Sequence, residues 1–259
     1  MADQLANLRV LVTRPAHQAA ALLQQLQALG ASPVPCPLLE ICPVSEADPD
    51  YHPLKQQIMD LDLYQHVIFI SPNAARIGCD WIDQYWPQLP VGIQWLAIGR
   101  QSAEQLLNYG IAAYHSPLGY DSEALLASPA LQQVAGERIL IMRGQGGREK
   151  LASTLRARGA EVSYAELYRR QCPDYSAAEL KQCLFSQPLD VILISSGEGL
   201  SNLLRITATT PELSRDSLFN CHLVVPSERV QQDAKEAGFK RVTTASGPDD
   251  ASMISALMP

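Results

Sequence analysis

One stretch, from Gly159 to Pro173, strongly constrains how this 259-residue chain can fold. Gly159 is typical of a residue that ends a helix. After it, Val162, Tyr164, Glu166 and Tyr168 occupy every second position, as on one face of a strand. The stretch continues to Pro173, which predicts an unusually long extended segment. A segment of this length fits a connection between two parts of a protein better than a strand inside one compact sheet.

A second stretch, residues 31–44, has the same character. It follows Gly30, which also predicts the end of a helix, and it contains four prolines, too many for a central strand. We interpret the two stretches as the connections between two lobes. This interpretation places Tyr168 at the mouth of the cleft between the lobes.

Short aliphatic strands alternate with helical segments along the whole chain. This alternation predicts an α/β fold with parallel sheets covered by helices on both faces, as in flavodoxin-like and Rossmann-like proteins. Ser71 followed by Pro72 predicts a helix start, and Gly110 and Gly238 predict helix ends. The expected strands cover residues 8–12, 66–70, 94–98, 112–115, 138–142, 190–194, 222–225 and 241–245. The expected helices follow these strands and also cover 51–63 and 177–184.

The chain also repeats itself. Arg14 and Gly30 recur at the same spacing as Arg143 and Gly159, and similar repeats link the remaining parts of the two halves. The two connections lie where a nested chain must change lobes. We therefore expect two three-layer lobes nested in sequence, lobe 1 from residues 1–37 and 173–259 and lobe 2 from residues 42–166.

The composition excludes several classes of protein. The chain is 47% hydrophobic, enough for a substantial core, but its longest aliphatic runs are far shorter than a membrane span. The six cysteines form no Cys-x-x-Cys pair and the histidines match no ligand spacing, so we expect reduced thiols and no metal. The net charge of −7 argues against nucleic-acid binding. The amino terminus lacks the pattern of a signal peptide, which favours a cytoplasmic protein.

Small polar residues follow most of the predicted strands. Ligands of open α/β sheets bind beyond the carboxyl ends of the strands, where free N–H groups can hold carboxylates or phosphates. Helix capping explains any one of these turns, but as a set facing one cleft they indicate an anionic ligand. The candidate turns are residues 13–14, 71–74, 99–102, 121–122, 143–148, 195–199 and 226–229.

The glycine-rich stretch from Arg143 to Arg148 invites comparison with nucleotide-binding loops. Glu149 occupies the position of the third glycine of a dinucleotide-binding motif, and no Gly-Lys-Ser/Thr follows. We therefore set nucleotide binding aside. Arg143 and Arg148 remain candidates for binding carboxylates.

Eight segments carry a further signal in their order and spacing, namely Val10–Pro15, Pro37–Ile41, Val67–Ala74, Ala97–Ala103, Ser122–Leu125, Ile139–Gly144, Leu155–Val162 and Leu167–Arg170. The last of them contains the sequence Leu167-Tyr-Arg-Arg170. In this order and spacing, nearly the whole chain resembles the uroporphyrinogen-III synthase family.

The resemblance implies two α/β lobes joined by two extended connections, the first lobe being built from both ends of the chain. It implies the substrate hydroxymethylbilane, a linear tetrapyrrole with eight carboxylates. The implied reaction removes the hydroxyl of ring A, inverts ring D through a spiro intermediate and closes the macrocycle, without a metal or an organic cofactor. It also implies a monomer in transient contact with neighbouring enzymes of tetrapyrrole biosynthesis.

The resemblance further implies roles for individual residues. Tyr168 matches the tyrosine that helps the hydroxyl to leave. The chain departs from the family at Ile194-Ser-Ser-Gly-Glu198 and near Glu228, where acidic residues stand beside turns expected to bind a polycarboxylate. The expected substrate-binding residues are Thr13, Arg14, Ser71, Asn73, Ala74, Gly99, Ser102, Ser122, Arg143, Gly144, Arg148, Ser195, Ser196 and Ser227.

Two other functions fit the same pattern less well. A two-lobed cytoplasmic binding protein or sensor for an anionic small molecule would use the same cleft without chemistry, but a sensor normally carries an output domain. A flavodoxin-like nucleotide enzyme would need a phosphate loop, which the sequence lacks.

Overall fold

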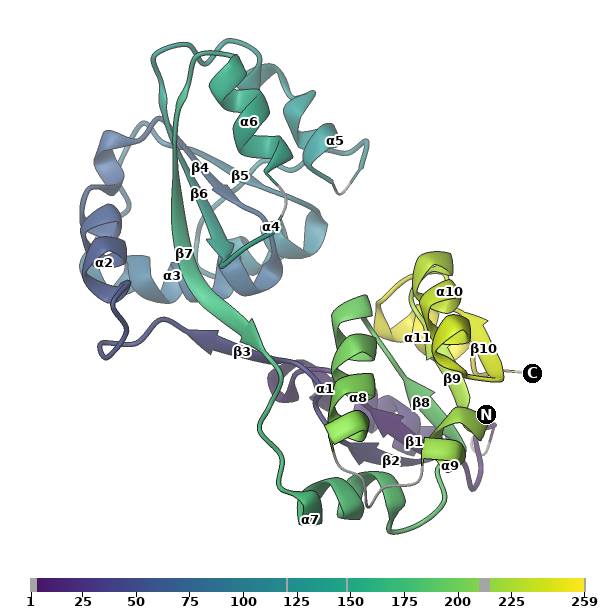
Figure 1. The fold of residues 1–259 in the computed structure, drawn as a ribbon. Helices are drawn as coiled ribbons and strands as arrows, with labels where there is room; N and C mark the ends of the chain where they lie inside the picture. Colours follow the sequence, from purple (N-terminus) through teal and green to yellow (C-terminus); the bar gives the residue numbers. More distant parts are fainter. Residues whose placement is uncertain (1–3, 120, 148, 210–214, 259) are drawn as a thin grey trace. The chain divides into compact units, whose positions relative to one another are not determined.

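A computed structural model describes residues 4–119, 121–147, 149–209 and 215–258. The chain forms two compact units (Figure 1). Unit 1 consists of Met1–Glu40 and Gln171–Pro259, and unit 2 consists of Ile41–Arg170. Each unit contains one five-stranded sheet with helices on both of its faces.

The sheet of unit 1 has the strand order β10-β9-β8-β1-β2, and all its neighbouring strands pair in parallel. Its strands are β1 (Arg9–Val12), β2 (Ser32–Pro35), β8 (Val191–Leu193), β9 (His222–Val225) and β10 (Arg241–Thr244). Its helices are α1 (Ala16–Ala28), α7 (Ala177–Leu180), the π-helix η3 (Lys181–Phe185), α8 (Gly197–Thr209), α9 (Arg215–Asn220), α10 (Glu228–Ala237) and α11 (Asp250–Ser255).

Alternating strand residues of unit 1 enter two cores. Leu11 and Ile192 face the core formed with α7, η3, α8, α9 and α10. Val10 and Leu193 face the core formed with α1 and α11. This period of two along each strand produces the three layers that the sequence predicted.

The sheet of unit 2 has the strand order β3-β7-β6-β4-β5, and the pairs β7-β6, β6-β4 and β4-β5 are parallel. Its strands are β3 (Glu40–Pro43), β4 (His66–Phe69), β5 (Gln94–Ala97), β6 (Arg138–Gly144) and β7 (Glu161–Gln171). Its helices are α2 (Tyr51–Met59), α3 (Pro72–Tyr85), α4 (Arg100–Leu107), α5 (Ser122–Leu126), α6 (Lys150–Ala157) and the 3-10 turns η1 (Leu61–Leu63) and η2 (Pro129–Leu131).

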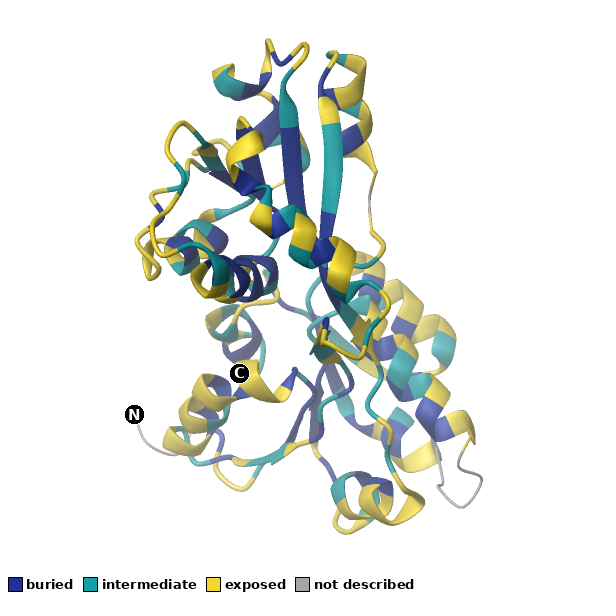
Figure 2. Ribbon diagram, turned by 90° about the vertical axis from the view of Figure 1, so that its left-hand side faces the viewer, coloured by how far each residue is buried: buried dark blue, intermediate teal, exposed yellow. Residues whose placement is uncertain are grey.

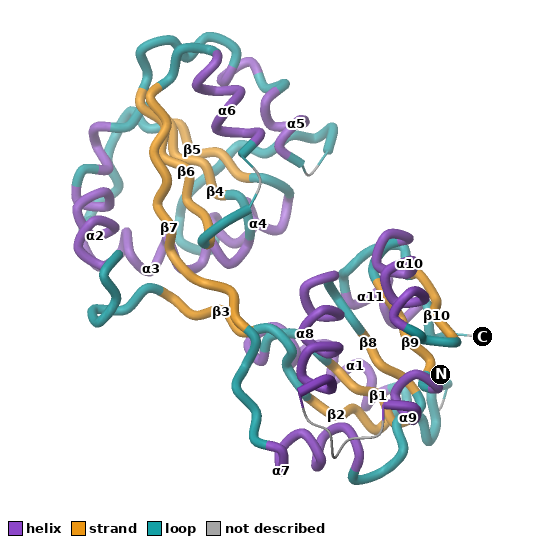
Figure 3. Tube along the Cα trace, in the orientation of Figure 1, coloured by secondary structure: helices purple, strands orange, loops and turns teal. Residues whose placement is uncertain are grey.

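Unit 2 repeats the three layers of unit 1. Phe69 and Met142 face the core with α2, α3 and α4, whereas Ile68 and Ile141 face the core with α5, η2 and α6. Figure 2 shows the buried residues along the strands and on the inner sides of the helices, and Figure 3 shows strands and helices alternating along the trace. The α/β fold class predicted from the sequence is confirmed.

Local signals in the sequence explain several helix ends. The Ser71 hydroxyl accepts a hydrogen bond from the Ala74 N–H and Pro72 begins α3, as predicted. Gly238 ends α10 in the left-handed conformation, with a φ of 111°. The start of α3 fixes where the loop beyond β4 ends.

The structure corrects the expectations in other places. The strand expected over residues 112–115 is a single bridge between Tyr114 and Leu96, because Ser116-Pro117 follows and proline has no N–H to continue the pairing. The helix expected over 51–63 ends at Met59 and continues as the 3-10 turn η1. Helix α9 was not predicted, since its six residues are too short for a clear apolar period.

The corrections that matter most lie where β6 pairs with β7. Arg143 and Gly144, expected in a turn, are the last residues of β6. Arg143 pairs with Glu166 but Gly144 pairs with Tyr168, so β7 has one extra residue at this point, a β-bulge. Leu167 and Tyr168 therefore belong to the same core, and the predicted alternation breaks just before Tyr168.

Candidate functional site

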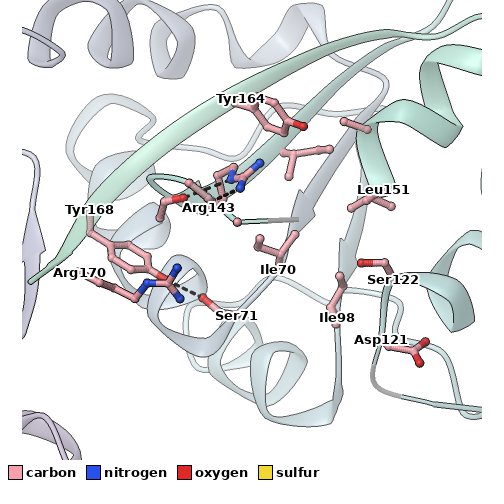
Figure 4. A pocket seen from close by; sticks show the side chains of 15 residues that line it. Ile70, Ser71, Ile98, Asp121, Ser122, Arg143, Leu151, Tyr164, Tyr168 and Arg170 are labelled. Carbon is pink, nitrogen blue, oxygen red and sulfur yellow. Dashed lines mark hydrogen bonds between the residues drawn. The ribbon is translucent and has the colours of Figure 1, made fainter. Parts of the chain in front are cut away.

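A cavity of about 470 Å³ lies in unit 2 beyond the carboxyl ends of β4, β5 and β6 and along β7 (Figure 4). Open α/β sheets bind their ligands at this edge. Its lining combines residues of β6 and β7, residues that follow β4 and β5, and residues of α5 and α6. The cavity is lined by Ile70, Ser71, Ile98, Asp121, Ser122, Ile141, Arg143, Gly144, Gly146, Gly147, Leu151, Ala152, Tyr164, Tyr168 and Arg170.

A polar chain, made of the two successive hydrogen bonds between Tyr168 and Ser71 and between Ser71 and the Ala74 N–H, holds Tyr168 at this cavity. The residue is 5% exposed, and its hydroxyl forms a hydrogen bond of 3.1 Å with the Ser71 hydroxyl. Ser71 in turn accepts from the Ala74 N–H at 3.1 Å, at the first turn of α3. The phenol is therefore linked through Ser71 to the positive end of a 14-residue helix.

Gly144 makes room for the Tyr168 ring. A Cβ atom at position 144 would stand 2.5 Å from the nearest ring carbon of Tyr168, closer than nonbonded carbon atoms can pack. The β-bulge and Gly144 together bring the ring against the backbone of β6. The orientation of Tyr168 thus depends on glycine, which has no side chain, at position 144 of the neighbouring strand.

Arg143 is 2% exposed, and the turn that follows β6 encloses it. Its guanidinium donates to the carbonyls of Gly144 and Gly146 and, over 3.3 Å, to a Glu149 carboxylate oxygen. It also lies 4.5 Å from the centre of the Tyr164 ring, a cation–π distance. Gly147, with a φ of 108°, would place a Cβ 2.7 Å from this guanidinium. Arg143 therefore fixes the conformation of one wall of the cavity.

Tyr164 and Glu149 complete this wall. The Tyr164 hydroxyl donates to Glu149 over 2.5 Å. Burial, with help from the Glu149 charge, raises the pKa of Tyr164. The same hydrogen bond and the positive charge of Arg143 lower the pKa of Glu149. At neutral pH the phenol thus stays protonated while the carboxylate stays charged beside Arg143.

Arg170 lines the cavity but was not among the expected site residues. It stands two positions after Tyr168 on β7, and residues at this spacing share a face of a strand. Figure 4 shows both side chains extending from β7 to the same side, into the cavity. The spacing itself was the signal that could have identified Arg170.

Five expected residues line this cavity, namely Ser71, Ser122, Arg143, Gly144 and Tyr168. The others of unit 2, Asn73, Ala74, Gly99 and Ser102, are not part of its lining. The Ala74 N–H is used by the cap of α3, and Gly99, with a φ of 78°, directly precedes α4. Ser102 is 1% exposed, and its hydroxyl has no hydrogen-bond partner within the described part of the chain. Arg148 lies outside the described residues.

The expected residues of unit 1 mostly make contacts inside that unit. The Thr13 hydroxyl donates to the Leu193 carbonyl over 2.6 Å, and Arg14 pairs with Asp250. Ser196 caps α8 by accepting from the Gly199 N–H over 3.0 Å. Ser195 follows β8, and Ser227 directly precedes α10 without capping it.

The described residues contain no group of three or more His, Cys, Asp or Glu side chains that could hold a metal ion. Among the same residues, no helix is both long and apolar enough to cross a membrane.

Fold and site together define a two-unit α/β protein with a cavity at the carboxyl edge of one sheet. Comparison with known proteins gives the family. The family model described as "Uroporphyrinogen-III synthase HemD" matches residues 20–255. The chain is 35% identical over 250 residues to the uroporphyrinogen-III synthase of Salmonella typhimurium, covering 96% of this chain and 99% of the relative. It is 33% identical over 253 residues to that of Escherichia coli, with the same coverage. The chain belongs to the uroporphyrinogen-III synthase family.

Solved structures agree with the fold. A mutant uroporphyrinogen III synthase from Thermus thermophilus matches with a TM-score of 0.59 and 19% identity over 96% of this chain and 97% of that one. The Helicobacter pylori enzyme matches with a TM-score of 0.59 and 13% identity, over 97% and 98% of the two chains. The predicted family is confirmed, and the comparisons give no support to the binding-protein alternative.

Proposed function

We propose that this chain converts hydroxymethylbilane to uroporphyrinogen III, as a lyase that removes water, inverts ring D and closes the macrocycle. Membership of the family supports the reaction. The observation that carries the chemical part is the Tyr168 hydroxyl, which lies in a cavity at the strand ends and is hydrogen-bonded to Ser71.

The two hydrogen bonds of Ser71 support proton donation from Tyr168 to the substrate. Ser71 accepts from the Ala74 N–H, so its own proton is available for the Tyr168 oxygen. In this arrangement the phenol O–H points away from Ser71 and can donate to the departing hydroxyl of ring A. The C–O bond then breaks and the hydroxyl leaves as water.

Positioning contributes more than the proton in this proposal. The substrate is a flexible chain, and the enzyme must bring its two ends together and select the carbon that attacks. The buried Arg143 keeps the turn after β6 in shape, and Ser122 and Gly144 complete the lining. We propose that exposed N–H groups and hydroxyls of these turns hold the carboxylates, together with Arg170. Of the expected residues of unit 1, Ser195 and Ser227 remain proposed contacts, whereas Thr13, Arg14 and Ser196 make contacts within the unit. A cytoplasmic location and a monomeric state are also proposed.

The direct test is to supply hydroxymethylbilane to the purified protein, oxidise the products and separate the type I and type III uroporphyrin isomers. We expect type III product well above a control without enzyme. Type I product alone, at the spontaneous rate and from folded protein, would contradict the proposal.

The variant Tyr168→Phe tests the role of the hydroxyl. It keeps the ring against Gly144 and removes only the donor, so we expect kcat to fall by about 10²-fold, the lower end of the range for general acid–base groups. Tyr109→Phe is the matched control, because the Tyr109 hydroxyl donates to Asp80 on the surface. Equal kcat values for the two variants would remove Tyr168 from the mechanism.

A further inference from the structure

A second cavity, of about 480 Å³, lies in unit 1 and contains two cysteines. The Sγ atoms of Cys36 and Cys183 are 2.9 Å apart, although the residues are 147 positions apart in the sequence. A disulfide bond is about 2.05 Å long, so the two sulfurs need to approach by less than about 1 Å to bond. The cavity is lined by Arg9, Val34, Pro35, Cys36, Tyr175, Glu179, Gln182, Cys183, Ser186 and Gln187.

The backbone holds both cysteines in place. Cys36 directly follows β2 and is 1% exposed, and its N–H donates to the Val12 carbonyl. Cys183 is half-buried in the π-helix η3, which continues α7. The Tyr175 hydroxyl donates to the Pro37 carbonyl over 2.8 Å and so joins the segment before α7 to the segment that carries Cys36.

The two thiols lie in different environments, and the difference determines which of them reacts first. The hydrogen bond from Cys36 lowers the pKa of Cys183, and backbone N–H groups of η3 add to the effect. The same bond, together with burial, raises the pKa of Cys36. Since the thiolate is the nucleophile in thiol–disulfide exchange, Cys183 reacts first and Cys36 keeps its proton.

We propose that Cys183 and Cys36 form a reversible dithiol site that reacts with low-molecular-weight disulfides entering the unit 1 cavity. The Cys183 thiolate attacks one sulfur of the small disulfide and releases the other half as a thiolate. The Cys36 sulfur then attacks Cys183 and displaces the second half, which leaves with the Cys36 proton. The two protein thiols lose two electrons, and the small disulfide becomes two thiols.

The other thiols nearby are less suited to the first step. Burial raises the pKa of both Cys172 and Cys221. The Cys221 thiol donates to the Leu189 carbonyl and lies outside this cavity. Burial also raises the pKa of Cys79, in unit 2, to about 12. Among the described cysteines with a resolved pKa shift, Cys183 is the one whose pKa is lowered.

The experiment uses the full chain and oxidised glutathione, followed by thiol counting under denaturing conditions and peptide mapping by mass spectrometry. The reduced chain has six thiols, and we expect four after oxidation, with the Cys36 and Cys183 peptides linked. A reducing agent should restore all six. Six thiols after treatment, or a link between other cysteines, would overturn the proposal.

Variants separate the two steps. Cys36→Ser should accumulate a glutathione adduct on Cys183, because the sulfur that resolves it is gone. Cys183→Ser should form neither the adduct on Cys36 nor the link. Cys172→Ser is the matched control and should form the Cys36–Cys183 link at the rate of the unaltered chain. An adduct that persists on Cys183 while Cys36 is present would show that Cys36 does not act as the second thiol. None of these outcomes depends on synthase activity, so they test the dithiol site separately from the proposed function.

Discussion

The two units share one architecture but use the carboxyl edges of their sheets differently. In unit 2 this edge contains the cavity with Tyr168, Ser71 and the enclosed Arg143. In unit 1 the corresponding polar residues bind the unit together, as Thr13 does with the Leu193 carbonyl and Arg14 with Asp250. A repeated fold therefore does not give its two copies the same site, because the chemistry depends on individual side chains.

The two arginines that the sequence repeat relates show this difference. Arg14 pairs with a carboxylate of the last helix of unit 1. Arg143 donates to the carbonyls of Gly144 and Gly146 and lies over the ring of Tyr164. The glycines after Arg143 allow the turn to fold back over the guanidinium, whereas Arg14 is followed by Pro15.

The largest expected effect comes from filling the space next to Tyr168. Gly144→Val places a side chain where the ring lies, so Tyr168 must move, and a displacement of about 1 Å can cost about 10²-fold in rate. We expect a loss of 10²-fold or more in kcat/KM for type III product. The control in unit 1 is Gly199→Ala, whose Cβ would meet only the Ser196 hydroxyl at 3.4 Å. Comparable losses in folded protein from both variants would contradict the difference between the units.

The next effect tests the polar chain. Ser71→Ala removes the partner of Tyr168 and a helix cap, so we expect about 10-fold lower kcat and about 1 kcal/mol lower stability. Ser176→Ala, which removes the cap of α7 in unit 1, should lower stability similarly and leave kcat unchanged. Steady-state kinetics and urea unfolding measure the two effects. If both variants kept full kcat, Ser71 would be a helix cap and nothing more.

A variant of Thr13 tests whether this residue of unit 1 serves stability and not substrate binding. Thr13→Val removes the hydroxyl that donates to the Leu193 carbonyl, so we expect about 1 kcal/mol lower stability with kcat/KM within about twofold. Thr13→Ser keeps the hydroxyl and should behave like the unaltered chain. A raised KM without any loss of stability would instead indicate a substrate contact.

The smallest effect concerns an ion pair within unit 2. A hydrogen bond from Arg169, supported by the Ser45 N–H, lowers the pKa of Asp48 from 3.8 to about 2. Because the folded pKa is the lower one, Asp48 stabilises the fold above about pH 4, and this contribution is lost as the pH falls through about 2. Asp48→Asn should lower the urea midpoint at pH 7 and converge with the unaltered chain below about pH 2. Asp62→Asn, on the exposed turn η1, should follow the unaltered chain, and identical curves for both variants would exclude the Asp48 contribution.

Much of the fold could be predicted because its signals are local. Buried strands such as Val191–Leu193 are short aliphatic runs, and Ser71-Pro72 and Gly238 mark helix ends by their backbone preferences. The bulge on β7 could not be predicted in this way, since it depends on how two strands distant in sequence align. The enclosure of Arg143 likewise depends on contacts with Tyr164, which belongs to another strand.

The sequence by itself determined the α/β class, the position of most strands and helices, and the family, because periodicity, caps and segment order are properties of the chain. It also identified Tyr168, Ser71, Ser122, Arg143 and Gly144 as candidates, all of which line one cavity. Only the tertiary structure decided which polar groups are already engaged in contacts within a unit, as those of Thr13 and Arg14 are. It alone brought Cys36 next to Cys183. The physical reason is that these contacts join residues far apart in the sequence. At such separations the number of residues between two side chains does not determine their distance in space.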